Sequence, residues 1–257
     1  GTAAADTFTV SDAAITHGSL QGVNTIANVD GLAVAGNEGS DTFNVTAGAI
    51  PISIDGGDGA GDAIAIAAGN NSATFNTGPE NDEGSFAIGG AAGLVSFDHV
   101  ESLTVDGNSV AGNAATINGT SADNDITLTA TSVDDFTVGI DGQSVTFSDF
   151  NSASLNGADG ADDISVTSLA VFTTTLTVAG DSPTGTSGDT LHVEGTAAGE
   201  TIAVTGNTIT VGGAGAITYG TIESLSLDAA GGTDTITVTG STAYDYTPGS
   251  SADAGSL

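Results

Sequence analysis

The feature that most constrains the fold of this chain is an internal repeat. Three segments begin alike, at Gly1-Thr2, Gly119-Thr120 and Gly195-Thr196, and a fourth, from Gly61, parallels the residues that follow Glu200. Self-similarity of this kind is the sequence signature of repeat architectures. A second repeated block lies downstream of each start, at residues 29–34, 100–105, 150–155 and 222–227. The chain divides into four degenerate modules and a remainder: 1–60, 61–118 with an acidic insert at 77–84, 119–194, 195–240, and a tail or linker to the next module or subunit at 241–257.

Within the modules, apolar residues alternate with Thr, Ser or small residues, and clusters of Gly, Asp and Asn separate the alternating stretches. A period of two predicts β-strands, and such clusters predict turns. Six pairs carry the pattern most clearly: Ile52/Ile54, Ile126/Leu128, Val145/Phe147, Leu176/Val178, Leu191/Val193 and Ile209/Val211. We therefore expect an all-β fold with no substantial helix.

Two all-β architectures fit this pattern. Most strands offer only two inward apolar residues, and the chain has no Trp. A β-sandwich core normally draws on longer strands and bulkier anchors. A solenoid closes its core by stacking similar small residues from one turn of the chain to the next. We therefore expect a right-handed parallel β-solenoid of about four modules, with tandem β-sandwich domains as the alternative.

The charge of the chain has a single sign. No Lys or Arg is present against 32 Asp and Glu, so the formal net charge is −32. Without basic side chains the protein has nothing to bind phosphates, which excludes nucleic acid as a partner and argues against an anionic membrane surface. No apolar run is long enough to span a bilayer, so we expect no membrane insertion. A chain of this charge needs external cations to offset its self-repulsion.

The turns before many strands follow a loose pattern, Gly-x-x-Gly-x-Asp-x-apolar, as in residues 36–43 and 157–164. These words resemble the glycine-aspartate nonapeptide of the RTX (hemolysin-type) calcium-binding family. The resemblance implies structural calcium held by aspartate oxygens, and Asp163 adds a neighbouring carboxylate. In this chain the copies of the pattern are isolated, whereas in the family they follow one another in tandem. An Asp before a strand also often closes an Asx-turn on its own backbone. The predicted metal ligands are Asp41, Asp62, Asp162, Asp163, Asp189 and Asp234.

The remaining acidic and histidine residues show fewer features of a functional site. The acidic insert, which includes Glu80 and Glu83, is interpreted as a solvated loop tip, with chelation as the alternative. The histidines His17, His99 and His192 share no motif. No nucleophile motif is present, and the basic side chains that commonly help to hold sugar in polysaccharide-cleaving β-helices are missing. We therefore predict no catalytic residue and no enzyme, with a polysaccharide-active β-helix as a remote alternative.

In composition and in its short repeated segments, the chain resembles large repetitive bacterial and archaeal surface proteins, such as surface-layer proteins and giant adhesins rich in Gly, Ala, Thr and Asp. This resemblance implies an extracellular, cell-surface location and a structural role in a layer or filament. The expected partner is the protein itself, as a homo-oligomer or polymer. The alternative is an adhesin stalk or a module that binds a carbohydrate or host partner. Because the chain begins at Gly1 without Met or a signal peptide, we expect a processed or excised segment.

Overall fold

The computed structural model describes residues 1–18, 23–108, 112–183 and 188–240. In this part of the chain the secondary structure consists of β-strands and one 3₁₀ turn, Leu169–Val171. The predicted all-β class is confirmed. No described helix is long and apolar enough to cross a membrane. The strands fall into two compact units: unit 1 comprises Gly1–Asn118 with Asp141–Phe150, and unit 2 comprises Gly119–Ile140 with Asn151–Leu257. All of the predicted module boundaries stay predictions.

Unit 1 contains two mostly parallel sheets. In hydrogen-bonding order, its first sheet is β15 (Gln143–Ser148), β11 (Ser102–Asp106), β7 (Ala63–Ala67), β5 (Thr42–Thr46), β1 (Thr7–Ser11), β2 (Ala14–His17) and β3 (Val23–Thr25). Its second sheet is β12 (Ala114–Asn118), β8 (Ala73–Thr77), β9 (Gly84–Ile88), β10 (Val95–Asp98), β6 (Ile52–Asp58) and β4 (Leu32–Glu38). Antiparallel pairs occur where the chain turns back within one sheet, as in β1–β2–β3 and β8–β9–β10.

Unit 2 is built in the same way. Its first sheet is β23 (Ser224–Asp228), β19 (Thr190–Glu194), β17 (Asp163–Thr167), β13 (Asp125–Ala130) and β14 (Phe136–Ile140). Its second sheet is β24 (Thr235–Thr239), β20 (Thr201–Thr205), β21 (Thr208–Val211), β22 (Ile217–Gly220), β18 (Thr175–Ala179) and β16 (Ser152–Asn156). The antiparallel excursions are β13–β14 and β20–β21–β22.

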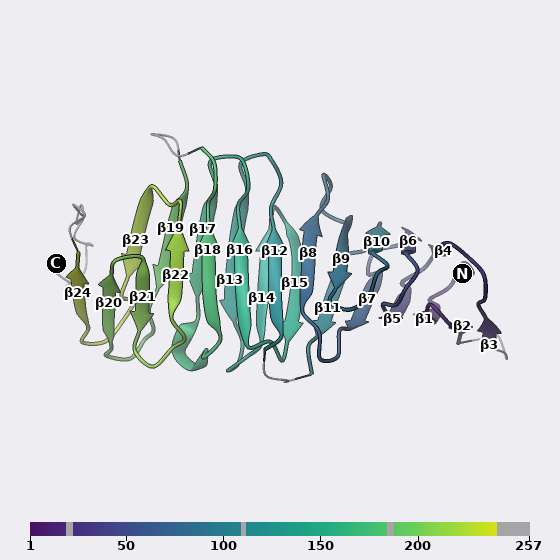
Figure 1. The fold of residues 1–257 in the computed structure, drawn as a ribbon, viewed down its shortest axis with the longest axis horizontal. Helices are drawn as coiled ribbons and strands as arrows, with labels where there is room; N and C mark the ends of the chain where they lie inside the picture. Colours follow the sequence, from purple (N-terminus) through teal and green to yellow (C-terminus); the bar gives the residue numbers. More distant parts are fainter. Residues whose placement is uncertain (19–22, 109–111, 184–187, 241–257) are drawn as a thin grey trace. The chain divides into compact units, whose positions relative to one another are not determined.

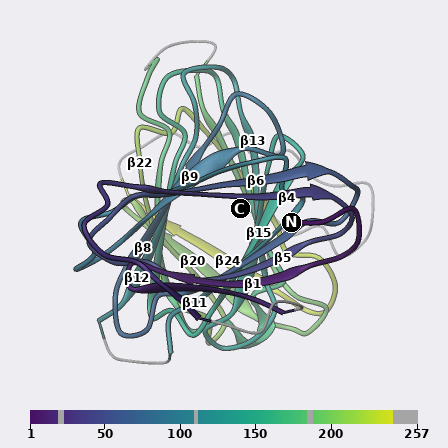
Figure 2. The same ribbon diagram turned by 90° about the vertical axis from the view of Figure 1, so that its right-hand side faces the viewer.

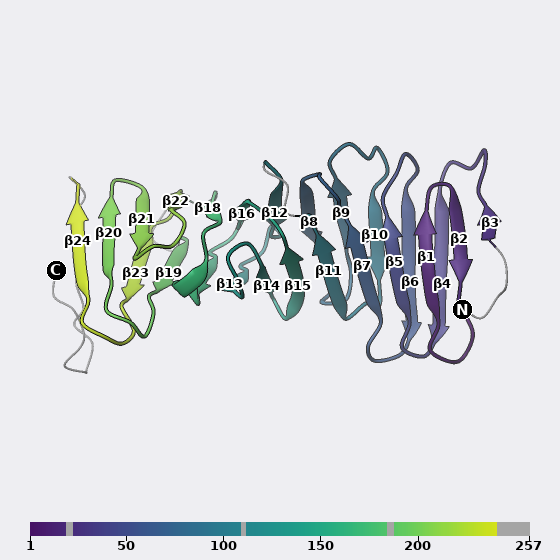
Figure 3. The same ribbon diagram turned by 90° about the horizontal axis from the view of Figure 1, so that it is seen from below.

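The chain alternates between the two sheets of a unit. In unit 1, β4 lies in the second sheet, β5 in the first, β6 in the second and β7 in the first. Strands β4 and β6 therefore pair in parallel, as do β5 and β7. The strand that lies between the two in sequence belongs to the other sheet. Figures 1 and 3 show β5, β7 and β11 side by side, and Figure 2 shows β1 and β5 opposite β4 and β6.

The core is made of apolar columns that run across the strands. In unit 1 the register places Phe8, Phe43, Ile64, Leu103 and Val145 in one line across five strands. All five are buried, and the Phe8 and Phe43 rings stack with centroids 5.1 Å apart. Each such side chain contributes about 1.5–3 kcal/mol relative to an exposed one. The period-two prediction is confirmed, because all six of the apolar pairs that defined it are buried.

Candidate functional site

In unit 1, an acidic residue stands directly before each of four adjacent parallel strands of the first sheet. Asp6, Asp41, Asp62 and Glu101 precede β1, β5, β7 and β11. The Asp6 backbone N–H donates to Asp41 Oδ1 at 2.6 Å, and the Asp41 N–H donates to Asp62 Oδ1 at 2.6 Å. The Asp62 N–H donates to Glu101 Oε2 at 2.7 Å. We call this chain of carboxylate-to-backbone bonds the first ladder.

Unit 2 repeats the arrangement with four members, which we call the second ladder. Asn124, Asp162, Asp189 and Glu223 precede β13, β17, β19 and β23. Each N–H donates to the side chain of the next member, at 2.8 Å from Asn124, 2.9 Å from Asp162 and 2.8 Å from Asp189. Both ladders therefore run through two central aspartates and finish on a glutamate.

A shorter third ladder lies in the second sheet of unit 2, before β20 and β24. The Glu200 N–H donates to Asp234 Oδ1 at 3.0 Å. In all three ladders a return bond follows: the residue after one member donates its N–H to the backbone carbonyl of the previous member. Thr42 donates to Asp6 O at 2.9 Å, and Thr235 donates to Glu200 O at 2.9 Å. Every step of a ladder thus ties two neighbouring strands at their starting ends.

The repeated Gly-Thr openings are the loops that start the ladders. The Thr2 N–H donates to Asp6 Oδ2 at 2.5 Å, the Thr120 N–H to Asn124 Oδ1 at 2.9 Å, and the Thr196 N–H to Glu200 Oε1 at 2.5 Å. In each loop the threonine hydroxyl also accepts the N–H of the alanine two residues on. The first member has no earlier ladder member to donate to its side chain, and the Thr N–H supplies a donor instead.

Central ladder carboxylates are buried and partly unsatisfied. Asp41, Asp62 and Asp189 are 0% exposed. Their Oδ1 atoms accept the ladder bonds, but their Oδ2 atoms, and that of Asp234, have no hydrogen-bond partner among the described residues. A buried ionised carboxylate with an unpaired oxygen is costly, because its hydration is lost without replacement. With no Lys or Arg in the sequence, only a proton or an external cation can offset that cost.

A glycine lies against the Oδ2 atoms of Asp41, Asp62 and Asp189. A Cβ on Gly36 would overlap Asp41 Oδ2 and the Gly56 carbonyl oxygen, and a Cβ on Gly180 would overlap Asp189 Oδ2. These positions are closed to any larger residue. The free Oδ2 of Asp41 is thereby held close to a carbonyl oxygen, which offers it no donor.

Asn113 stands directly before β12, as the ladder aspartates stand before their strands, and its side chain is an amide. Its Nδ2 donates to the carbonyl oxygens of Gly107 and Asp149, both at 2.7 Å. The Asp62 site has the same construction, because a Cβ on Gly56 would overlap His99 O and lie 3.0 Å from Asp62 Oδ2. The Asn113 amide supplies the donor that an ionised aspartate lacks. The Oδ2 position therefore suits a protonated carboxyl or a bound cation.

The titration behaviour follows from this environment. Burial raises the pKa of Asp62 above its ordinary value, and the neighbouring Glu101 charge adds to the rise. Burial likewise raises the pKa of Asp189, with a further contribution from Glu223. These are the same positions in the two ladders, each next to the closing glutamate. The Thr2 backbone N–H, assisted by His17, lowers the pKa of Asp6 against the opposing effect of burial.

The three histidines have different surroundings. His17 on β2 is buried, its Nε2 lies 3.0 Å from Asp6 Oδ1, and its ring meets Phe8 edge-on. His99 is exposed, with Nδ1 3.0 Å from Asp55 Oδ1 and 3.7 Å from Asp98 Oδ1. The hydrogen bond to Asp55 raises the pKa of His99. His192 Nδ1 lies 3.2 Å from Ser226 Oγ. None of the three joins a catalytic arrangement with the ladders.

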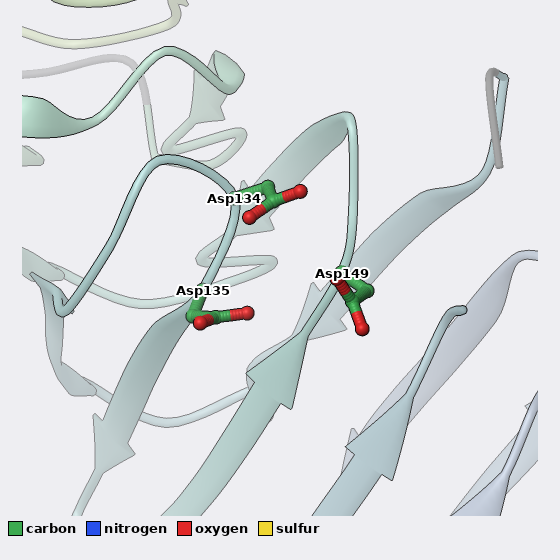
Figure 4. A group of neighbouring side chains, drawn as sticks. All are labelled: Asp134, Asp135 and Asp149. Atoms are coloured by element: carbon green, nitrogen blue, oxygen red, sulfur yellow. The ribbon is translucent and has the colours of Figure 1, made fainter. Parts of the chain in front are cut away.

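Two further acidic groups lie outside the ladders. The insert at 77–84 is the hairpin loop between β8 and β9, closed by a bond from the Glu80 N–H to Glu83 Oε1 at 3.0 Å. Figure 4 draws Asp134 and Asp135, which precede β14 in unit 2, and Asp149, which follows β15 in unit 1. Ser132 Oγ donates to Asp135 Oδ2 at 2.7 Å. Because these aspartates belong to different units, we assign them no shared site.

The predicted metal ligands are distributed unevenly. Asp41 and Asp62 lie together in the first ladder, Asp162 and Asp189 in the second, and Asp234 in the third. Asp163 is exposed at the start of β17 and lies beside Asp125 in the parallel register, outside the ladder. Their role as calcium ligands stays a prediction. The predicted ligand set leaves out five ladder members, although the sequence places Asn124 and Glu200 at positions equivalent to the predicted aspartates. Each of the five shows the same signal, an acidic or amide residue two positions before the first of two alternating apolar residues: Asp6, Glu101, Asn124, Glu200 and Glu223.

Comparisons with known proteins add no relatives. No protein-family model, curated protein or solved structure matches the chain. The functional argument therefore depends on the ladders and the sheets that carry them.

Proposed function

We propose that this protein is a non-enzymatic, extracellular structural protein, a β-solenoid that assembles with copies of itself into a surface layer or filament. The observation that carries the proposal is the ladder. The same carboxylate-to-backbone bond recurs at every step of three ladders, which supports a stack of equivalent strands that adds length by repetition. Such a stack presents strand edges at its ends, which favour pairing with further strands.

The use of the carboxylates supports a structural role. The side chains of the ladder aspartates accept backbone N–H bonds, and three of them are 0% exposed. A catalytic carboxylate must reach a substrate, and these do not reach the surface. The proposal is therefore that the conspicuous aspartates build the fold and do not act on a ligand in solution.

Cations, with calcium the best candidate, are the second part of the proposal. Asp125 and Asp163 are exposed neighbours in register on parallel strands, and Glu38 and Asp58 form a similar pair. Two carboxylates about 6 Å apart repel by roughly 3 kcal/mol at an effective dielectric of about 20. Calcium prefers such oxygen ligands and would bridge them. The buried ladder aspartates have two routes to compensation, a proton or a cation, which a calcium titration separates.

Sedimentation velocity of the full chain tests the proposal. The chain is run over a range of concentrations in calcium chloride, in sodium chloride of equal ionic strength, and in chelator. We expect large, concentration-dependent species in calcium and smaller ones in chelator. Large species of equal size in both salts would exclude a role for calcium in assembly and would still support self-assembly. A monomer in every condition would refute the structural role.

A further inference from the structure

The third ladder is unfinished within the described residues. The first and second ladders have four members and close on Glu101 and Glu223, whereas the third passes from Glu200 to Asp234 and has no later member. The Asp234 N–H and carbonyl face the side on which a further strand would lie, and no described residue binds them. Among the described residues, strand β24 pairs with β20 alone. This end of unit 2 has room for one more acidic strand.

The apolar residues at this end are also uncovered. Ile236 and Val238 on β24, with Leu225 and Leu227 on β23, are only partly buried. The residues at the same positions one strand earlier, such as Ile202 on β20, are 0% exposed. A further strand packed against β24 would complete their burial.

The start of unit 1 carries the complementary feature. Asp30-Gly31-Leu32-Ala33-Val34 has the acid-x-apolar-x-apolar pattern of every ladder strand, and its block aligns with the blocks that contain Glu101 and Glu223. Asp30 is nevertheless exposed and in no ladder. Within the part of the chain that the structure describes, strand β4 pairs with β6 alone. Val29 is 41% exposed, whereas its equivalent Val100 is 0% exposed. An acidic strand therefore stands here without a preceding neighbour.

We propose that β4 of a second copy of this chain docks beside β24, with Asp30 of that copy as the closing member of the third ladder. The inference rests on the self-assembly proposed above and names the surfaces that carry it. The register follows from the existing ladders: the Asp234 N–H donates to the Asp30 carboxylate, and the Gly31 N–H donates to the Asp234 carbonyl. These bonds repeat those made by Asp41 and Thr42 with Asp6.

The hydrogen-bonding polarity of the two edges agrees with this docking. The Leu32 N–H donates to Pro51 O at 2.9 Å, toward β6, so the N–H groups of Gly31 and Ala33 point to the free side of β4. The Thr235 N–H donates to Glu200 O, toward β20, so the N–H groups of Ile236 and Val238 point to the free side of β24. In register, the N–H groups of Gly31 and Ala33 meet the carbonyls of Asp234 and Ile236. The pairing stops before the Ala35 carbonyl, because that oxygen already accepts the N-terminal amine of Gly1 at 2.5 Å.

Two consequences follow for the assembly. The contact joins two different surfaces of successive copies, so it is heterologous. Such contacts build closed rings or open filaments, and the proposed function corresponds to the open form. It also brings Asp30 close to Asp234, so screening by salt or a divalent cation strengthens it.

Three substitutions in the full chain test the contact by sedimentation velocity in calcium chloride. Asp30→Ala removes the acceptor, and Asp30→Asn keeps one, as Asn124 does in the second ladder. Ala33→Pro removes an N–H from the free edge while leaving the bonds between β4 and β6 in place. Glu80→Ala, which removes one exposed carboxylate from the β8–β9 loop, is the control for charge. Far-UV circular dichroism establishes that each variant is folded.

We expect Asp30→Ala and Ala33→Pro to raise the dissociation constant about tenfold or more, and Asp30→Asn and Glu80→Ala to assemble as the wild type does. If the wild type assembles and Asp30→Ala and Ala33→Pro assemble equally well, the docking inference is wrong and the proposed function stands. If the wild type itself stays monomeric in every salt, both fail.

Discussion

His17 Nε2 lies 3.0 Å from Asp6 Oδ1, the atom that in every later aspartate of the ladders accepts a backbone N–H. Asp6 is the first member of its ladder, so no earlier strand supplies that donor. Because an ionised carboxylate only accepts hydrogen bonds, the buried histidine is the donor. A side chain on β2 thus contacts the oxygen that, in the later ladder aspartates, accepts a backbone N–H.

Replacement of His17 by Phe should cost about 2 kcal/mol in the free energy of unfolding. Phe retains a ring beside Phe8 but leaves Asp6 Oδ1 buried without a donor. Denaturant unfolding at neutral pH measures the loss. His192→Ala, at a histidine whose Nδ1 lies 3.2 Å from Ser226 Oγ, is the control and should cost less than about 0.5 kcal/mol. Equal losses in the two variants would show that His17 acts by packing alone.

Asp62→Asn and Asp189→Asn should stabilise the protein above neutral pH. The pKa of each aspartate is raised above the ordinary value of 3.8, so the folded state holds these protons more tightly than the unfolded state. Wild-type stability from these groups is therefore highest in acid and falls as the pH rises through their folded pKa values. An amide at either position has no proton to lose and can donate, as Asn113 does.

Each variant should be more stable than the wild type at pH 8 and should lose its advantage near pH 4. Denaturant unfolding at a series of pH values measures this. Glu80→Gln, at an exposed carboxylate in the β8–β9 loop, is the matched control. Destabilisation of both ladder variants at pH 8 would indicate that the ionised form, with a bound cation, is the native one.

Gly157→Ala should destabilise the protein by about 3 kcal/mol or prevent folding. Its Cβ would overlap Asp162 Oδ2, and the ladder bond beside it cannot move without separating two strands. Gly220→Ala is the control, because its Cβ meets nothing within 4 Å. Thermal unfolding of the two variants measures the difference. A tolerated Gly157→Ala would mean that the ladder carboxylate has another position available.

The His99 pKa should lie above 6.5 and fall in Asp55→Asn, since the hydrogen bond to Asp55 is the main cause of the rise. The pair therefore stabilises the fold below the ordinary histidine pKa, and this contribution disappears as the pH rises through the folded value. An NMR titration of the His99 ring in both proteins measures the shift. An unchanged pKa in Asp55→Asn would assign the rise to Asp98 and the other nearby acids.

The strands could be predicted from the sequence, because burial of one face of a strand makes every second residue apolar. Ile126 and Leu128 show this alternation. The aspartates before strands were also recognised as special. Their partners were not, since the ladder bond joins residues 21–39 positions apart and its acceptor lies on another strand. Asp6 with His17 illustrates the limit: no local pattern relates them, and only the antiparallel return of β2 brings them together.

The antiparallel excursions were missed for a related reason. Strands such as β9 and β21 show the same alternation as their parallel neighbours, so periodicity does not distinguish a strand that turns back from one that continues the stack. The direction is decided by the connecting loop. Between β20 and β21 only Gly206 and Asn207 intervene, a connection too short for a parallel crossover.

Electron microscopy of the full wild-type chain, purified and then placed in calcium chloride, tests the central claim most directly. If the protein is a stack of equivalent strands that continues from copy to copy, the micrographs will show unbranched filaments, alone or laid side by side in sheets, and Ala33→Pro will shorten them. Dispersed single particles of constant size at every protein and calcium concentration would contradict the account.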